Sequence, residues 1–210
     1  MVHRRELLKR CSIGWAASML PRCLAAQTPA QNAPLPAGVT ALVNIAPNWV
    51  EGQQMFDPIG IHLPKGGKVR WQLPVMPAHM LGATVTAFHP SNRNHELRIP
   101  ESARPFDSGP INFDNRFVDG RIIFEWTFEV EGTYDYYSTV HEVYGMVGRI
   151  VVGKPGGPSE QFPPGYGARS GRAVVYPAEV KLLNACPSSE IMERDVVPYP
   201  RDLVTRPHPF

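Results

Sequence analysis

The sequence predicts an all-β sandwich for the middle of the chain. Short runs rich in Val, Ile, Phe, Tyr and Trp recur between Gly and Pro residues over residues 39–152. None of these runs has a convincing helical period, and seven or eight short strands in a segment of this length are typical of two packed sheets. We therefore expect a Greek-key β-sandwich of seven or eight strands, followed by an irregular, Pro-rich C-terminal extension.

The candidate strands follow one another closely along this segment. The turn Lys65-Gly66-Gly67 separates two of them, because glycine permits the backbone reversal that a tight turn requires. In another, three tyrosines lie within four residues, and the alternation of side chains along a strand turns at least one of them toward the core. The expected strands are Thr40–Ile45, Ile59–Leu63, Lys68–Leu73, Thr84–Ala87, Glu96–Ile99, Ile122–Glu129, Gly132–Tyr137 and Arg149–Val152.

Residues 1–26 have the features of an export signal. Arg4-Arg5 form a twin-arginine pattern, an apolar stretch runs from Ile13 to Leu20, and small residues follow at Ala25-Ala26. The apolar stretch is too short to cross a membrane. We expect twin-arginine export to the periplasm and a linker over residues 27–38; the alternative is a basic amphipathic N-terminal helix.

The charge and cysteine content of the chain argue against a nucleic-acid-binding protein and against a protein held together by disulfides. The chain has 21 basic and 19 acidic residues, but removal of the signal would leave 16 basic and 18 acidic residues, a net charge of −2. This balance gives no indication of nucleic-acid binding. Of the three cysteines only Cys186 lies outside the signal, so no internal disulfide is possible in the exported chain, and we expect Cys186 to be a packed or free thiol.

The C-terminal extension, residues 154–210, differs in composition from the sandwich. Prolines and glycines interrupt it throughout, and only Ala178–Asn184 has the pattern of a short helix. It nevertheless carries many apolar residues between its prolines. We expect these to pack against the sandwich or against a partner, since a soluble monomer rarely exposes that many hydrophobic side chains.

One loop carries the residues with the clearest chemical meaning. His141 and Met146 lie five residues apart between two β-rich runs, so that one loop can direct both side chains to a single point. Imidazole and thioether are soft ligands that suit copper better than magnesium or calcium. For each residue a structural role is the alternative: His141 as a buried histidine bonded to the backbone, and Met146 as a core residue.

Four segments resemble a known family. The segment Phe56–Trp71 resembles the first half of a bacterial plastocyanin-like cupredoxin, and Asn94–Ile99 resembles the segment that carries its first copper histidine. Phe106-Asp107-Ser108-Gly109 is similar to the turn that follows, and Gly132–Val152 to the closing strand, ligand loop and last strand. The resemblance covers roughly residues 50–152 and implies a cupredoxin-like domain over residues 39–153.

Carried over residue by residue, the resemblance implies a copper site that lacks one ligand. The family's histidines fall on His95 and His141 and its axial methionine on Met146, but its cysteine falls on Ser138. A serine hydroxyl is neutral and hard, so it cannot replace the thiolate that dominates a blue-copper site. The remaining donors favour Cu(I), or Cu(II) completed by water or a carboxylate such as Glu142.

The segment before His95 is longer than the family usually has. It brings three further candidate ligands, His79, Met80 and His89, close in sequence to His95. These are a candidate second soft-metal cluster, although loop histidines without fixed spacing are as readily structural. Ser138 itself has a structural alternative too, as a strand residue bonded to the backbone.

These observations lead to one functional hypothesis and two alternatives. The hypothesis is a periplasmic copper-binding protein of the electron-carrier lineage, not an enzyme, since no Ser–His–Asp arrangement, phosphate loop or carboxylate pair stands out in the sequence. The first alternative is a metal-free interaction or assembly subunit of a periplasmic oxidoreductase or copper-handling complex. The second is copper delivery. We expect any partner to be a periplasmic redox or copper-handling protein.

Overall fold

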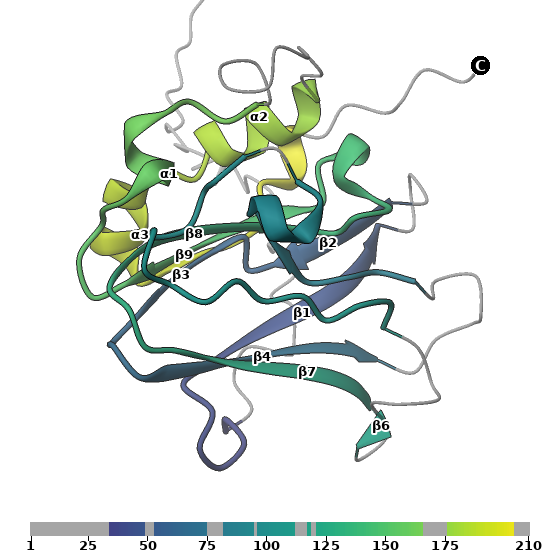
Figure 1. Ribbon diagram of the computed structural model, residues 1–210. Helices are drawn as coiled ribbons and strands as arrows, with labels where there is room; N and C mark the ends of the chain where they lie inside the picture. Colours follow the sequence, from purple (N-terminus) through teal and green to yellow (C-terminus); the bar gives the residue numbers. More distant parts are fainter. Residues whose placement is uncertain are drawn as a thin grey trace, which may run out of the picture. The chain divides into compact units, whose positions relative to one another are not determined.

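Two five-stranded sheets face each other in the computed structural model, which describes residues 34–48, 53–74, 82–94, 96–111, 117–118, 121–165 and 176–203 (Figure 1). The strand order is β2-β1-β4-β7-β6 in the first sheet and β10-β3-β9-β8-β5 in the second. The chain crosses repeatedly from one sheet to the other. The predicted all-β sandwich is confirmed.

The first sheet is built on the long pairing of β4 with β7. These two strands are antiparallel over eight residue pairs, from Gly67 opposite Phe128 to Pro74 opposite Arg121. Strands β1 and β4 are parallel, so the connection between them must leave the sheet and return. The strands of this sheet are β1 (Ala41–Asn48), β2 (Gln53–Asp57), β4 (Gly67–Pro74), β6 (Phe117–Val118) and β7 (Arg121–Phe128).

The second sheet positions the residues of functional interest. Strands β8 and β9 form an antiparallel pair over six residues, and β3 lies parallel to β9. The loop between β8 and β9 contains His141. The strands of this sheet are β3 (Gly60–Leu63), β5 (Thr86–Ala87), β8 (Gly132–Tyr137), β9 (Val147–Val152) and β10 (Val196–Val197).

One predicted strand is wrong. The segment Glu96–Ile99 forms no strand, although the amide of Asp135 donates to the Arg98 carbonyl oxygen (2.9 Å) and the Arg98 amide donates to Phe88 (3.0 Å). The segment therefore lies beside β8 without a continuous ladder. Three strands, β2, β6 and β10, have no counterpart among the predicted ones. The last two are only two residues long, too short for an alternating pattern to register.

The core between the sheets is centred on Trp71, which is fully buried. Its ring centroid lies 5.5 Å from that of Tyr136 on the opposite sheet and 5.6 Å from that of Phe124 on the neighbouring strand. Phe106 adds a further ring at 5.9 Å. Aromatic pairs at these separations add to the burial of their apolar area, so this cluster holds the two sheets together.

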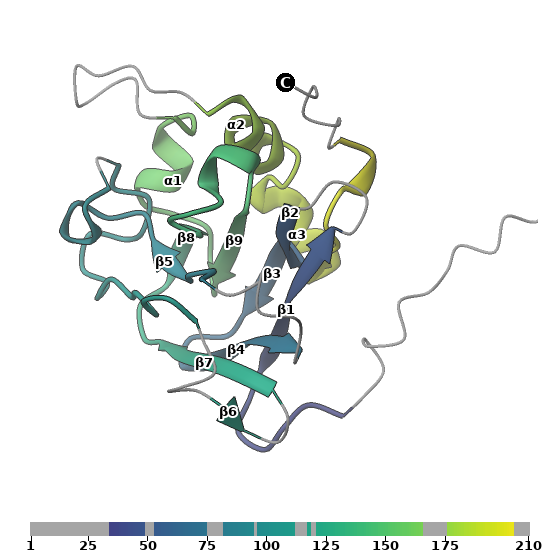
Figure 2. The same ribbon diagram turned by 90° about the vertical axis from the view of Figure 1, so that its right-hand side faces the viewer.

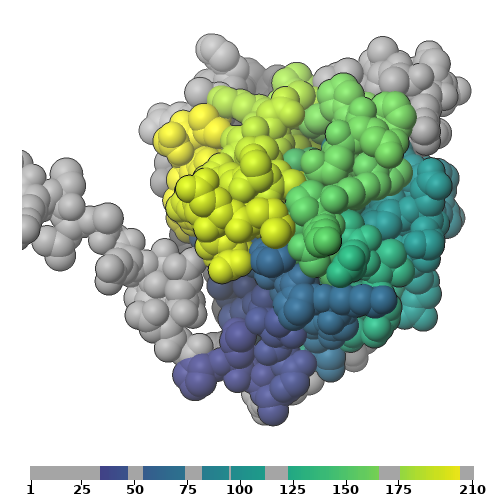
Figure 3. Space-filling view, turned by 90° about the vertical axis from the view of Figure 1, so that its left-hand side faces the viewer, coloured from purple at the N-terminus to yellow at the C-terminus, as the bar shows by residue number. Residues whose placement is uncertain are grey.

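The C-terminal extension folds onto the second sheet and is not wholly irregular. The predicted helix at residues 178–184 is confirmed, whereas the helix that follows it was not expected. Figure 1 shows these segments, in green and yellow, lying over the face of the second sheet that points away from the first, and Figure 3 shows them gathered on the surface at one end of the molecule. The helices are α1 (Pro158–Gln161), α2 (Pro177–Asn184) and α3 (Ser188–Arg194), with 3₁₀ turns η2 (Pro90–Asn92), η3 (Glu142–Tyr144) and η4 (Arg201–Leu203).

A second apolar cluster, here called the outer cluster, joins the extension to the sheet. Residues of the extension pack in it against side chains of β8 and β9, so both strands are buried along their whole length. The expected burial of the tail's apolar groups is confirmed for Val197 and Tyr199 but is wrong for Val196, which is 44% exposed. Cys186 is buried with a free thiol, as expected. The outer cluster comprises Met55, Ile59, Phe88, Tyr137, Val147, Val151, Leu182, Leu183, Cys186, Ile191, Val197 and Tyr199.

A buried charge cluster holds the extension at two places. Asp135 on β8 accepts hydrogen bonds from Arg149, its register partner on β9 (2.7 and 2.9 Å), and from Arg98 (2.8 Å). Both guanidinium groups then donate to carbonyl oxygens of the extension, Arg98 to Phe162 (3.1 Å) and Arg149 to Cys186 (3.2 Å). The cluster therefore fixes the extension to the sheet. Across the described residues, no helix is long and apolar enough to cross a membrane.

Candidate functional site

The β8–β9 loop, residues 138–146, is closed by its own backbone. The amide of Ser138 donates to the Met146 carbonyl oxygen (3.0 Å), and the amide of Met146 donates to the carbonyl oxygen of His141 (3.1 Å). Gly145 takes a left-handed conformation (φ 85°), which ends η3 and turns the chain back into β9. The sequence therefore forms a tight loop that brings both of its ends and His141 together.

Ser138 and His141 are brought into direct contact. The Oγ atom of Ser138, which is fully buried, lies 3.2 Å from Nδ1 of His141. The same oxygen accepts a hydrogen bond from the Thr84 amide (3.1 Å), so its own hydrogen is free for donation to the imidazole. Sequence reasoning missed Thr84, because only the pairing of distant segments places it here. Burial lowers the pKa of His141, which favours the neutral imidazole that a metal requires.

The distance between Ser138 Oγ and His141 Nδ1 can be compared with the distance between two ligand atoms of one metal. Two donors bound to one metal at typical distances lie roughly 3.3–3.7 Å apart. The 3.2 Å between Ser138 Oγ and His141 Nδ1 is close to that range. The same distance is that of an ordinary hydrogen bond between a hydroxyl oxygen and a ring nitrogen, so it is compatible with a shared metal and equally with a purely structural contact.

Met146 lies at the base of the loop. It is fully buried and belongs to the cluster between the two sheets. Its backbone bond to His141 keeps the two residues adjacent in space as well as near in sequence. The predicted pairing of His141 with Met146 in one loop is consistent with this position, and so is the alternative of Met146 as a core residue.

The other candidate ligands of the sequence are less fully described. His95 lies outside the described residues, as do His79 and Met80. His89 has a local role instead, because its Nδ1 atom accepts a hydrogen bond from the Ser91 amide (3.1 Å) and caps the 3₁₀ turn η2. The second soft-metal cluster therefore receives no support from His89.

Buried carboxyl groups lie near the loop. Glu142, at the start of η3, is buried, and Glu179 on α2 is fully buried with no hydrogen-bond partner for either carboxyl oxygen among the residues that the structure describes. Burial, and then the negative charges of Glu142 and Glu96, raise the pKa of Glu179 to about 9. Burial likewise raises the pKa of Glu96 to about 7, with Arg98 opposing the shift. Glu179 is therefore protonated at neutral pH.

These carboxyl groups do not form a ready cation site. Within the described ranges, no three His, Cys, Asp or Glu side chains lie close enough together to hold a metal ion. Any metal bound at the loop would need Met146, or a donor from outside those ranges such as His95. The donor set of imidazole and thioether suits copper, preferably as Cu(I), and lacks the thiolate of a blue-copper centre.

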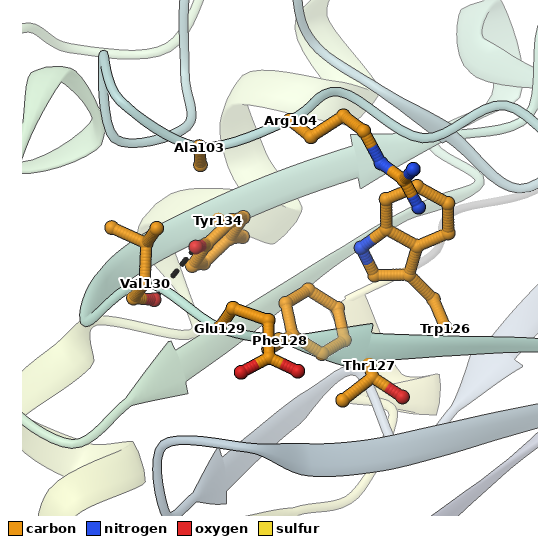
Figure 4. Close-up of a pocket in the computed structure, with 8 residues that line it drawn as sticks. All are labelled: Ala103, Arg104, Trp126, Thr127, Phe128, Glu129, Val130 and Tyr134. Atoms are coloured by element: carbon orange, nitrogen blue, oxygen red, sulfur yellow. Dashed lines mark hydrogen bonds between the residues drawn. The ribbon is translucent and has the colours of Figure 1, made fainter.

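A pocket of about 100 Å³ lies elsewhere on the sandwich, beside β7 (Figure 4). The guanidinium carbon of Arg104 lies 4.3 Å from the centre of the Trp126 ring, so the arginine already covers the aromatic face that a ligand would use. No candidate site residue of the sequence lines it. Its lining residues are Ala103, Arg104, Trp126, Thr127, Phe128, Glu129, Val130 and Tyr134.

Comparison with protein-family models and with curated proteins gives no match. Among solved structures, the chain is similar to pseudoazurin from Methylobacterium extorquens, with 19% identity, a TM-score of 0.44, and coverage of 69% of this chain and 94% of that one. It is also similar to pseudoazurin from Hyphomicrobium denitrificans (21%, 0.36, 55% and 76%) and to plastocyanin from Dryopteris crassirhizoma (19%, 0.38, 53% and 99%). All three TM-scores lie below 0.5, so the fold assignment depends on the observed sheets.

Proposed function

We propose that the chain is an exported, cupredoxin-like copper-binding protein whose site lacks the thiolate. His95, His141 and Met146 would hold the metal, preferably as Cu(I). The observation that carries the proposal is the closure of the β8–β9 loop, in which backbone bonds join Ser138 to Met146 and Met146 to His141. This closure supports a loop that can direct an imidazole and a thioether to one metal, with a hydroxyl group where a thiolate would complete the set.

Copper in such a site would behave differently from copper in a blue centre. The bound metal would supply a soft, redox-active centre, but without a thiolate it would lack the strong visible charge-transfer band. The ligands left would favour different geometries for Cu(I) and Cu(II), so electron transfer would be slow. A protein of the electron-carrier lineage with these properties is suited to holding or delivering copper in the periplasm, with a redox or copper-handling protein as its partner.

The proposal is tested on the full chain purified from the periplasm, by metal analysis and by absorption and EPR spectroscopy. We expect about one copper ion per chain and a nearly colourless protein. Ser138→Cys should add an intense visible band with Cu(II) and tighten copper binding by orders of magnitude, because a coordinated thiol is deprotonated and adds a full charge. Ser188→Cys, a buried serine on α3, is the matched control and should gain no band.

A second candidate function has its own support. The hydrogen-bond partner at Nδ1 of His141 is already Ser138, so the loop is satisfied without a metal. The same loop exposes Val140, Val143 and Tyr144, each with about half of its surface accessible. These features favour a metal-free module that holds a periplasmic partner. A Ser138→Cys variant that stays colourless, with copper bound no more tightly than before, would favour this function over the first.

A further inference from the structure

Helix α2 of the extension packs directly on the β8–β9 loop. It contacts η3 and β9, and Figure 2 shows α2 beside the short helical turn of the loop. The helix lies close to the backbone of Gly145. A Cβ atom added there would lie 2.5 Å from Cδ1 of Leu182 and 3.1 Å from Cβ of Ala178. A side chain at this position would displace the end of Leu182 and crowd Ala178, so the loop and α2 fit each other at this point.

The same helix contributes to both ends of the loop. Leu182 and Leu183 are buried in the outer cluster, and the cluster includes Tyr137 and Val147. Tyr137 is the last residue before Ser138, and Val147 is the first after Met146. The apolar side of α2 thus belongs to the cluster that holds the strand residues on either side of the loop.

The segments on both sides of α2 are fixed to the sandwich independently. On one side, the Arg98 guanidinium donates to the Phe162 carbonyl oxygen near α1. On the other, Arg149 donates to Cys186, and Nδ1 of His62 lies 3.0 Å from the carboxylate of Asp195. Because these bonds lie outside α2, they hold neighbouring parts of the extension on the sandwich without involving the loop.

We propose that α2 is a positioning element for the β8–β9 loop. Leu182 and Ala178, which pack on Gly145, hold residues 142–146 in the conformation that buries Met146 and determines the position of the His141 side chain. The extension is then part of the candidate site although no atom of it need touch the metal. The effect of α2 on copper binding rests on the proposed function, whereas the effect of α2 on the conformation of the loop does not.

The first test compares two buried residues of the extension in the full chain. Leu182→Ala removes the contact with Gly145, whereas Ile191→Ala removes a comparable buried side chain that contacts Gly60 instead. Hydrogen exchange is measured at the loop amides of Ser138, Gly145 and Met146. We expect Leu182→Ala to speed their exchange by about tenfold or more relative to Ile191→Ala. Equal exchange at these amides in the two variants would overturn the proposal.

A double-mutant cycle tests the contact itself. Gly145→Ala should be costly in the wild-type chain, where the added Cβ meets Leu182, and less costly in the Leu182→Ala background. The strain of a positive φ is common to both backgrounds and cancels. Denaturant midpoints of the four proteins give the coupling, and additive effects would contradict the contact.

Copper competition with a chromophoric chelator gives a readout that a purely structural role would not move. Leu182→Ala should weaken Cu(I) binding by about tenfold, and Ile191→Ala should leave it unchanged. If the wild-type chain binds no copper, the proposed function fails while the exchange test still decides the role of α2. If the wild-type chain binds copper and Leu182→Ala binds it equally well, α2 does not position the site.

Discussion

The Oγ atom of Ser138 lies between the backbone amide of Thr84, at 3.1 Å, and Nδ1 of His141, at 3.2 Å. The serine therefore joins a residue before β5 to the β8–β9 loop in a buried place. The hydroxyl group thus has a structural role at a position where the resemblance implies a thiol. It also leads to a simple prediction of stability.

Ser138→Ala should destabilise the protein by about 1–3 kcal/mol, because the buried Thr84 amide would lose its acceptor. Urea unfolding at neutral pH measures this difference. Ser189→Ala, at an exposed position in α3, is the control and should change little. A Ser138→Ala variant as stable as the control would show that water or another group satisfies the Thr84 amide.

Asp135→Asn should be far more costly, by about 3–5 kcal/mol, because it removes the carboxylate that two buried guanidinium groups share and leaves Arg98 only the carboxylate of Glu96, at 3.7 Å. Burial alone would raise the pKa of Asp135, but Arg149 and Arg98 outweigh it and hold the pKa below its usual value. The stability that this carboxylate provides is thus present above the pKa of the unfolded chain and is lost as the pH falls through the lower, folded pKa.

The measurement for Asp135 is urea unfolding of the wild-type and variant proteins at several pH values. Asp202→Asn, on the exposed turn η4, serves as the control. The difference between wild type and Asp135→Asn should shrink on acidification. A difference below 1 kcal/mol at neutral pH would mean that the cluster is not the anchor described above.

Glu179→Gln should stabilise the protein, and increasingly so at higher pH. The folded pKa is raised to about 9, so the folded chain keeps a proton that the unfolded chain releases above its ordinary value of 4.5. The stabilising effect of this proton is present below pH 4.5 and is lost as the pH rises through the folded pKa. The amide of glutamine at position 179 does not ionise, so the variant does not lose this stability as the pH rises.

Denaturant midpoints at pH 4, 6 and 8 test this expectation. The two proteins should be alike at pH 4 and differ at pH 8 by about 1 kcal/mol or more, since a tenfold difference in proton affinity corresponds to about 1.4 kcal/mol. Glu193→Gln, an exposed change on α3, should show no such trend. A constant difference across this range would contradict the protonated state of Glu179.

Ending the chain after Gly157 should abolish cooperative thermal unfolding. The truncation removes the extension's half of the outer cluster and the carbonyl acceptors of Arg98 and Arg149. It would expose the apolar side chains of β8 and β9 that face the extension. Near-UV circular dichroism during heating measures the transition. A truncated protein that melts at the temperature of the full chain and keeps its partners would make the extension a mere linker.

The sequence by itself determined the fold class and most of the strands. The runs that form β4 and β7 alternate between polar and apolar residues, and those that form β8 and β9 are rich in Tyr, Val and Ile; such patterns indicate a strand whatever its partner is. It also determined the spacing of His141 and Met146 in one loop and the position of the helix at residues 178–184. These are local features, and local propensity decides them.

Tertiary structure alone decided what surrounds the loop. The register of β8 and β9 places Arg149 opposite Asp135, and a distant segment brings Arg98 to the same carboxylate. Thr84 reaches Ser138 across 54 residues of sequence, and Leu182 reaches Gly145 from the extension. Each of these contacts joins residues that share no pattern along the chain, because it arises only when the sheets and the extension pack together.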